Sequence, residues 1–389
     1  MTWTKTTLSE VSDIQTGPFG SQLHASDYVN SGIPIIMPQD IVGNRVITDT
    51  IACIREEDAI RLAKYRVAPG DIIYSRRGDV ERHALIGNAE NMWLCGTGCL
   101  RVRPNKHKVI PQYLHYYLSS PDSRAWIRSH AHGTTMPNLN TTILGDTPIC
   151  YPQIENQIKI CGILELLDKK IDINNDLNDH LQEQAATVYG KYFPYTVTDD
   201  LPVGWRVGTV GEIVEIHDSK RIPLSGAQRA KMEKRIYPYY GAASLMDYVD
   251  EYIFDGKYLL LGEDGTVVDD AGYPILQYVW GQFWVNNHAH ILTGKLGFNV
   301  ESLLLLFRQT PVKSIVTGAV QPKISQANLR SIQVVVPPQP ELDAFNELIR
   351  PLFDQIRQNQ DQNKVLSSLR DALLPKLMSG ELNVSSIPL

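Results

Sequence analysis

Apolar residues recur every three or four positions along two long segments of the chain. In the first segment, positions 160, 164, 167, 171, 174, 178, 181, 185 and 188 follow this spacing, and only Asn174 and Asn178 are polar. In the second, positions 345, 349, 352, 356, 359, 363, 366, 369, 373 and 377 do the same, broken only by Asn359 and Asn363. Such spacing over about four heptads predicts coiled-coil helices, with an amphipathic surface helix as the alternative.

The four asparagines carry information about how these helices pair. An asparagine at a seam position lowers stability but fixes register, because its amide needs a polar partner across the seam. Since both helices carry the same asparagine pair in mid-length, we expect Asn174, Asn178, Asn359 and Asn363 to set the register of an antiparallel pair.

A shift of 185 residues superimposes much of the chain on itself. Pro137 falls on Pro322, Pro152 falls on Pro337, and the asparagine pairs of the two helices coincide. A period of this length is far too long for a solenoid repeat and indicates the duplication of a whole module. The part of each module before its helix is rich in glycine, proline and β-forming residues, which predicts short strands joined by turns.

These patterns together predict an α+β, pseudo-two-fold symmetric protein. We expect two mixed α/β domains, at residues 1–150 and 194–338, and two helical spacer regions, at 151–193 and 339–389. The two long antiparallel coiled-coil helices would join the domains and hold them apart.

Composition and charge narrow the functional classes. The chain has 389 residues, with 37 Lys and Arg against 43 Asp and Glu, and a formal net charge of −6. That balance argues against a free-standing nucleic-acid binder that depends on charge alone. The five cysteines fit a reducing compartment, and the sequence contains no apolar run of membrane-spanning length, so we expect a cytoplasmic protein with no membrane partner.

Sequence motifs for catalysis or metal binding are mostly missing. Each Gly-Lys pair is followed by Tyr or Leu, so none forms a phosphate-binding loop. Cys95 and Cys99 lack a second pair of ligands at zinc-finger spacing. His288 with His290, and Glu263 with Asp264, are possible metal ligands, but we interpret them as hydrogen-bonding residues and a turn. We therefore predict no catalytic residues and no metal site.

Loops that mix basic, amide and hydroxyl side chains are the best candidates for DNA contacts. Arg and Lys pair with guanine edges, Asn and Gln pair with adenine, and all four also contact phosphate. Basic loop residues are usually only solvated, so this signal is weak by itself. The candidates are Gln39, Asn44, Arg45, Ser75, Arg76 and Arg77 in the first module and Lys220, Arg221, Gln321 and Lys323 in the second.

Over essentially its full length the chain resembles the specificity subunits of type I restriction-modification systems. The resemblance rests on the order of short strings in two modules. They are GPFGSQL (17–23), GIPIIMPQDI (32–41), PGDIIYSRRG (69–78), KRIPL (220–224), YPYYG (237–241), YIFDGKYLLLGEDG (252–265), FWVNNHAH (283–290), QPKI (321–324) and LRDALLPKLMSG (369–380). The segment 79–82 (DVER) departs from the family pattern, so that loop's contacts transfer least. The strings add Tyr240, Asn287 and His288 as DNA-binding candidates.

The resemblance implies two target recognition domains, each of which reads half of a bipartite double-stranded DNA sequence. It also implies that the helices dock two methyltransferase subunits, and that restriction–translocase subunits join this core. The chain itself would be non-catalytic, with S-adenosylmethionine, ATP and Mg²⁺ held only by partner subunits. The alternatives are a duplicated metal-dependent nuclease and a two-headed structural adaptor that does not bind DNA.

Overall fold

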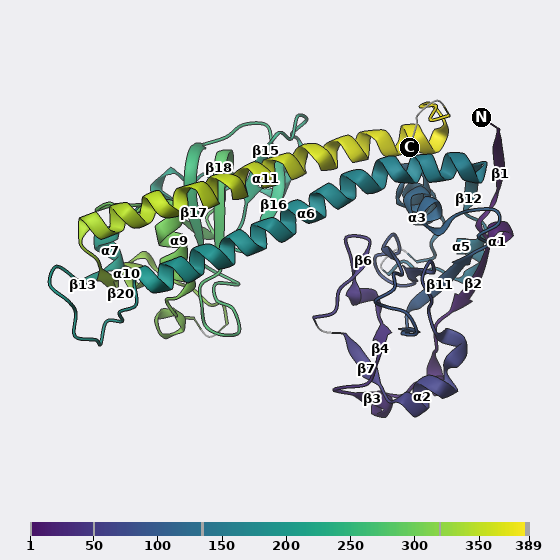
Figure 1. Ribbon diagram of the computed structural model, residues 1–389, viewed down its shortest axis with the longest axis horizontal. Coiled ribbons are helices and arrows are strands. Elements are labelled where there is room, and N and C mark those ends of the chain that lie inside the picture. Colours follow the sequence, from purple (N-terminus) through teal and green to yellow (C-terminus); the bar gives the residue numbers. More distant parts are fainter. Residues whose placement is uncertain (1, 50, 134–135, 319, 386–389) are drawn as a thin grey trace. The chain divides into compact units, whose positions relative to one another are not determined.

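The computed structural model describes residues 2–49, 51–133, 136–318 and 320–385 (Figure 1). The chain divides into two compact units. Unit 1 consists of Met1–Ile173 with Gln362–Leu389, and unit 2 consists of Asn174–Asp361. Both unit boundaries fall within the long helices α6 (Ile154–Tyr192) and α11 (Gln339–Ser379), so each unit contains part of both helices.

Unit 1 contains two four-stranded sheets. One has the strand order β2-β11-β8-β9 and the other has the order β10-β4-β7-β3, while β1 pairs with β12 and β5 pairs with β6. Its remaining elements, in chain order, are β1 (Trp3–Thr7), α1 (Leu8–Val11), β2 (Ser12–Thr16), β3 (Tyr28–Val29), β4 (Ile33–Ile36), β5 (Ile41–Val42), β6 (Arg45–Val46), β7 (Ala52–Ile54), α2 (Glu56–Arg61), β8 (Ile72–Ser75), β9 (His83–Leu85), β10 (Leu94–Cys95), β11 (Cys99–Pro104), α3 (Pro111–Ser119), α4 (Pro121–His130), α5 (Thr141–Gly145) and β12 (Pro148–Pro152).

Unit 2 is built around one six-stranded sheet. The sheet has the order β14-β19-β17-β18-β15-β16, and β13 pairs with β20 beside it. The elements are β13 (Arg206–Thr209), α7 (Val210–Ile213), β14 (Val214–Ile216), α8 (Gly226–Ala230), β15 (Tyr237–Tyr240), β16 (Leu245–Val249), β17 (Phe254–Gly262), β18 (Leu276–Val285), β19 (Ala289–Gly294), α9 (Val300–Arg308), α10 (Gln326–Ser331) and β20 (Gln333–Val336).

The duplication seen in the sequence is also present in the sheets. The order β2-β11-β8-β9 of unit 1 recurs in unit 2 as β14-β19-β17-β18, and the pair β1-β12 recurs as β13-β20. The units differ in what surrounds this common part. Unit 1 has the separate sheet β10-β4-β7-β3, whereas unit 2 extends its main sheet by the hairpin β15-β16.

The two periodic segments lie inside α6 and α11, so the predicted long helices are confirmed. In unit 2, the amide of Asn359 donates to the Asn178 side-chain oxygen at 2.9 Å. In unit 1, Arg370 pairs with Asp168 at 2.8 Å, and the Asn363 amide lies 3.5 Å from the Ile171 carbonyl. In unit 2, the rings of Tyr189 and Phe345 also meet, with centroids 5.6 Å apart. Within each unit, higher numbers on one helix therefore meet lower numbers on the other, and the helices are antiparallel.

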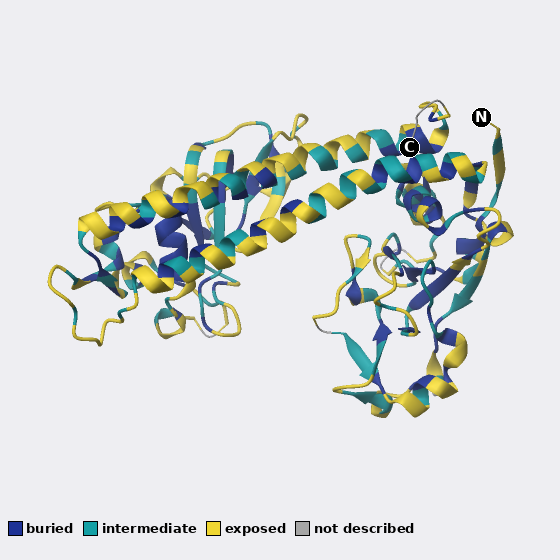
Figure 2. Cartoon of the chain, viewed as in Figure 1, coloured by how far each residue is buried: buried dark blue, intermediate teal, exposed yellow. Residues whose placement is uncertain are grey.

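Each unit attaches its part of the helices through its own apolar core. In unit 2, Phe345, Ile349, Phe353 and Ile356 of α11 join a core cluster that also contains residues of β17 and α9. Burying a side chain of this size contributes roughly 1.5–3 kcal/mol. Figure 2 shows buried and exposed positions alternating along both helices, as the sequence period requires. Among the described residues, no helix combines the length and the hydropathy that crossing a membrane requires.

Candidate nucleic-acid interface

Each unit contains a turn whose backbone is hydrogen-bonded to a segment later in the chain. The turn follows β8 in unit 1 and β17 in unit 2. In unit 1 the Gly78 amide donates to the Pro137 carbonyl at 3.1 Å, and the Leu139 amide donates to the Arg76 carbonyl at 2.8 Å. We call residues 76–78 with 137–139 the first paired loop.

Unit 2 repeats these contacts. The Gly265 amide donates to the Pro322 carbonyl at 3.0 Å, and the Ile324 amide donates to the Glu263 carbonyl at 2.8 Å. We call residues 263–265 with 322–324 the second paired loop. The matched bonds place Glu263 and Asp264 at the backbone positions that Arg76 and Arg77 occupy in the first paired loop.

Glycine and capping residues explain why the two paired loops share a conformation. Gly133 and Gly318 lie 185 positions apart and have φ of +95° and +88°, the left-handed region that favours glycine. A Cβ there would lie 2.9 Å from the Met136 carbonyl oxygen in unit 1 and 2.3 Å from that of Gln321 in unit 2. Just beyond the paired loops, Asn140 and Ser325 cap α5 and α10, also 185 positions apart.

Two predicted residues of unit 1, Arg76 and Arg77, lie on the first paired loop, and Ser75 directly precedes it at the end of β8. Ser75 is buried, and its hydroxyl donates to the Arg77 carbonyl at 3.0 Å. Arg76 is half-buried, and its Nε donates to the Leu139 carbonyl at 3.1 Å. Arg77 is exposed. Ser75 thus supports the turn, while the two guanidinium groups lie at its surface.

The other predicted residues of unit 1 lie in two different places. Gln39 is exposed and directly follows Pro38. Pro38 packs on Gly98. The Gly98 carbonyl accepts a hydrogen bond from the Arg76 amide at 2.7 Å. This segment is therefore a neighbour of the first paired loop.

The turn between β5 and β6 instead contacts helices of its own unit. Arg45 forms a bidentate pair with Asp172 of α6 at 2.6 and 2.8 Å. The Asn44 amide lies 3.3 Å from the Ser119 hydroxyl at the end of α3. These polar groups already have protein partners, which weakens the case for them as DNA contacts.

In unit 2 the predicted basic residues gather around Glu263. Arg221 lies 2.5 Å from Glu263 Oε2, and Lys323 lies 3.3 Å from Glu263 Oε1. The Arg221 guanidinium also donates to the Ala289 carbonyl at 2.8 Å. Sequence positions 221, 263 and 323 thus meet in one cluster, in which two cations surround one carboxylate.

The remaining candidates of unit 2 lie on adjoining segments. His288 Nδ1 hydrogen-bonds to Asp264 of the second paired loop, and the Asn287 carbonyl lies 3.3 Å from the Arg221 guanidinium. Tyr240 ends β15, and burial raises the pKa of its hydroxyl to about 12. Lys220, Asn287 and Gln321 are exposed.

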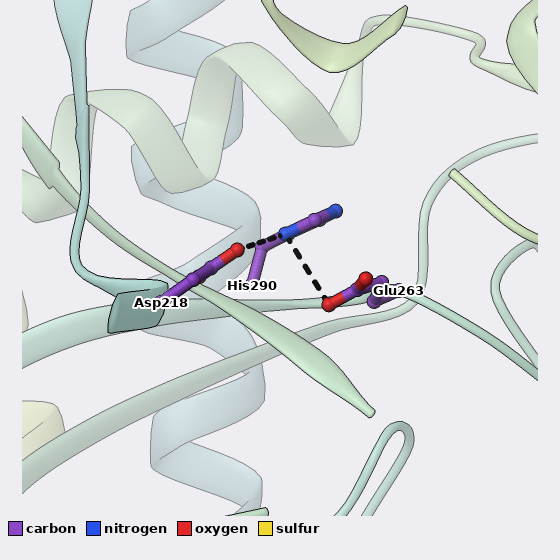
Figure 3. A group of neighbouring side chains, drawn as sticks. All are labelled: Asp218, Glu263 and His290. Carbon is purple, nitrogen blue, oxygen red and sulfur yellow. Dashed lines mark hydrogen bonds and ion pairs between the residues drawn. The ribbon is translucent and has the colours of Figure 1, made fainter. Parts of the chain in front are cut away.

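Asp218, Glu263 and His290 form the one cluster among the described residues with the composition and spacing of a metal site (Figure 3). His290 Nδ1 lies 2.6 Å from Asp218 and 3.7 Å from Glu263, and its Nε2 lies 2.8 Å from the Ile324 carbonyl. Nδ1 of His290 therefore faces the two carboxylates, and its Nε2 faces a backbone carbonyl.

The charged groups around this cluster pair with one another. Burial by itself would raise the pKa of Asp218, but the hydrogen bond and charge of His290, with Arg221 beyond, bring it below its ordinary value. Arg221 and Lys323 already balance Glu263. The geometry therefore fits a buried ion-pair network that holds β19 to the loops, and the absence of a metal site here stays a prediction.

Cys95 and Cys99 lie in an apolar core cluster of unit 1. Burial raises the pKa of the Cys95 thiol to about 12, which disfavours the thiolate that zinc needs. Both cysteines thus pack as buried side chains of this cluster.

Sequence reasoning missed the equivalence of Glu263–Asp264 with Arg76–Arg77. The 185-residue shift places Arg76 and Arg77 two residues short of Glu263 and Asp264, and the side chains have opposite charge. The match could have been found from Gly78 and Gly265, which end the two turns, and from Pro137 and Pro322 in the segments that they contact.

Comparison with known proteins agrees with this duplicated architecture. A family model described as "Type I restriction modification DNA specificity domain" matches residues 1–183 and 202–367. The chain belongs to this family. It is a specificity subunit, a non-catalytic component that selects DNA for a type I restriction-modification system.

Two relatives match this specificity subunit over most of their length. The type I restriction enzyme MjaIX specificity subunit of Methanocaldococcus jannaschii is 24% identical and covers 99% of this chain and 94% of its own. The EcoprrI specificity subunit of Escherichia coli is 23% identical over 85% of this chain and 82% of its own. The crystal structure of the S subunit from M. genitalium shares the fold, with a TM-score of 0.58 at 17% identity, and covers 97% of this chain and 96% of its own.

Proposed function

We propose that each unit of this specificity subunit reads one half of a bipartite double-stranded DNA target through its paired loop. The proposal rests on the backbone hydrogen bonds of the two paired loops, which are the same in both units. The side chains at the matched positions differ between the units. A shared scaffold with different polar side chains suits two readers of different sequences, because base edges differ in their pattern of donors and acceptors. Gln39 would contribute in unit 1, and Lys220, Asn287 and Gln321 would contribute in unit 2.

We further propose that the long helices bind two methyltransferase subunits, and that restriction–translocase subunits join through them. Unpartnered apolar side chains on both helices support this part of the proposal. In unit 1, Leu166 and Ile173 of α6 are 62% and 59% exposed, and Val365 and Leu369 of α11 are 69% and 45% exposed. Exposed apolar side chains mark a protein-binding surface where they form a contiguous patch. S-adenosylmethionine, ATP and Mg²⁺ would belong to the partner subunits.

The test is an exchange of the first reader. Residues 1–150 are replaced by the same span of a relative with a different target, and the chain is assembled with its methyltransferase subunits. Sequencing the methylated motif should show one half changed and the other preserved. A motif changed in both halves would rule out two independent readers.

Two controls separate the alternative functions. An assembled complex without affinity for DNA would favour the adaptor function. Cleavage of DNA by the isolated chain with Mg²⁺ or Mn²⁺ would favour the nuclease.

A further inference from the structure

The two paired loops present side chains of opposite charge at matched backbone positions. Arg76 and Arg77 of unit 1 correspond to Glu263 and Asp264 of unit 2, because the bonds to Pro137 and Leu139 recur with Pro322 and Ile324. The loops therefore differ most in the kind of hydrogen bond that they can make.

In the first paired loop the donor groups are available. Arg77 is exposed, and within the described part of the chain its side chain forms no hydrogen bond or ion pair. Arg76 uses its Nε for the Leu139 carbonyl, and no described carboxylate lies within ion-pair distance of its guanidinium. The loop thus offers at least one complete guanidinium to a ligand.

In the second paired loop, the carboxylates of Glu263 and Asp264 differ in how many of their oxygen atoms already have a partner. Both oxygens of Glu263 have cationic partners, Arg221 and Lys323. Asp264 uses Oδ1 for His288, while Oδ2 has no hydrogen-bond partner among the residues that the structure describes. The Asp264 side chain is 18% exposed, so Oδ2 is the acceptor of this loop that remains for a ligand.

DNA limits what such an acceptor can bind. Phosphate oxygens accept hydrogen bonds and repel a carboxylate, so the groups that can donate to Asp264 are the amino groups of bases. In the major groove these are cytosine N4 and adenine N6. Adenine places its N7 acceptor beside N6, where it would repel the carboxylate, whereas cytosine has no acceptor beside N4 on that edge.

We propose that the paired loops read base pairs with opposite hydrogen-bonding sense, Arg77 by donating to guanine and Asp264 by accepting from the N4 amino group of cytosine. This inference rests on the proposed function, because it assumes that the paired loops face the bases. A bidentate contact of Arg to guanine O6 and N7 discriminates by roughly 5- to 150-fold between right and wrong bases.

The experiment uses the complete chain assembled with its methyltransferase subunits and a library of random DNA duplexes. Bound duplexes are sequenced, so the readout is selection by binding. The wild type should select a G·C pair at one position of each half-site. Asp264→Ala should relax the cytosine by roughly 5-fold or more and leave the first half-site unchanged.

A second variant gives a directional result. Asp264→Asn keeps the size of the side chain and adds donors, and an amide pairs with adenine N6 and N7. Selection at that one position should therefore shift from cytosine towards adenine. In unit 1, Arg77→Gln should shift the guanine towards adenine for the same reason.

Controls come from the same loops. Asp270→Asn changes an exposed carboxylate in the segment after the second paired loop, and Arg82→Gln changes an exposed guanidinium after the first. Both should leave the selected sequence unchanged. Circular dichroism melts of every variant confirm that the chain remains folded.

The outcomes separate the inference from the proposed function. A wild-type complex that selects no sequence would overturn the proposed function, and the inference with it. A wild type that selects a bipartite target, with Asp264→Ala and Asp264→Asn selecting the same target, would overturn the inference alone. Weaker binding to all sequences alike, without a change of preference, would also overturn it.

Discussion

Asp172 and Arg357 occupy the same position of the repeat, each eighteen residues after the first residue of α6 or α11, yet they carry opposite charges. In unit 1, Asp172 pairs with Arg45, and the two side chains are 37% and 62% exposed. In unit 2, Arg357 pairs with Glu301 of α9, and these side chains are only 17% and 4% exposed. The helix residue is therefore the anion of the ion pair in unit 1 and the cation of the ion pair in unit 2.

The burial of the two ion pairs, and not merely their presence, decides how much each contributes to the stability of its unit. Glu301 also accepts from Lys257 and from the Tyr278 hydroxyl, both at 2.7 Å. Burial alone would raise the pKa of Glu301, but these bonds and charges bring it below its ordinary value. Exposed pairs such as Arg45–Asp172 contribute little, about 0–1 kcal/mol, because water and salt screen them.

The largest effect is therefore expected from reversing the charge in unit 2. Arg357→Glu would place a second carboxylate against buried Glu301. Breaking a buried pair in this way costs roughly 3–5 kcal/mol. Hydrogen exchange in increasing denaturant, read on peptides of α9 and β18, should report this loss of stability.

The matched control is Asp172→Arg in unit 1. It reverses the charge at the equivalent helix position, where the partner Arg45 is largely exposed, and should cost less than about 1 kcal/mol. Equal losses in the two units would refute the claim that burial distinguishes the two contacts.

A second difference between the units is how they respond to acid. In unit 1, burial lowers the pKa of His83 from 6.5 to about 4. Burial, followed by the charge of His83, also lowers the pKa of the neighbouring His115 well below its ordinary value. The charge of Arg124 acts on both rings in the same direction. Because the unfolded chain binds these protons at higher pH than the folded chain, stability is full above about pH 6.5 and is lost as pH falls towards 4.

Unit 2 depends mainly on carboxylates. The folded pKa values of Asp218 and Glu301 lie below their ordinary values, so their contribution is present above about pH 4.5 and is lost only as pH falls through the folded values. His217 of unit 2 also has a lowered pKa through burial, but its ring is half-buried, so we expect a smaller effect.

Between pH 6.5 and 4.5, unit 1 should therefore lose stability before unit 2. The expected slope from His83 alone is about 1.4 kcal/mol per pH unit. Hydrogen exchange on β8 and α3 compared with β17 and α9 across this range measures it. In His83→Gln the slope of unit 1 should decrease, since glutamine does not titrate; an unchanged slope would show that His83 is not its source.

The sequence predicted the parts of the fold that local periodicity controls. The helices α6 and α11 follow from apolar residues at intervals of three and four over about four heptads, a signal that needs no knowledge of distant contacts. The duplication follows from proline and asparagine pairs 185 residues apart, because these residues fix local backbone or seam contacts wherever they occur.

The parts that depend on distant contacts could not be predicted in the same way. Arg45 was a candidate for DNA, but its partner Asp172 lies 127 residues away on a helix. The extra sheet of unit 1 and the hairpin β15-β16 of unit 2 are formed by short strands whose pairing depends on tertiary packing. Glu263 and Asp264 had no readable role until their backbone contacts showed which loop of unit 1 they match.

The smallest effect concerns the asparagines at the helix seam, whose role in register remains a prediction. In unit 2, Asn178 Oδ1 accepts from Asn359, and the two side chains are 3% and 4% exposed. Asn178→Leu would leave the buried Asn359 amide without this acceptor and should cost roughly 1–3 kcal/mol. The double variant Asn178→Leu, Asn359→Leu removes both polar groups together and should recover most of that loss, because an apolar seam is intrinsically more stable.

The unfolding free energies of the two single variants and the double variant form a double-mutant cycle. The cycle should give a coupling of about 1 kcal/mol or more between positions 178 and 359. Crosslinking of cysteines placed on the facing helices would then show whether the double variant, although stable, populates more than one register. Additive single effects with one fixed register would mean that apolar packing alone aligns the helices.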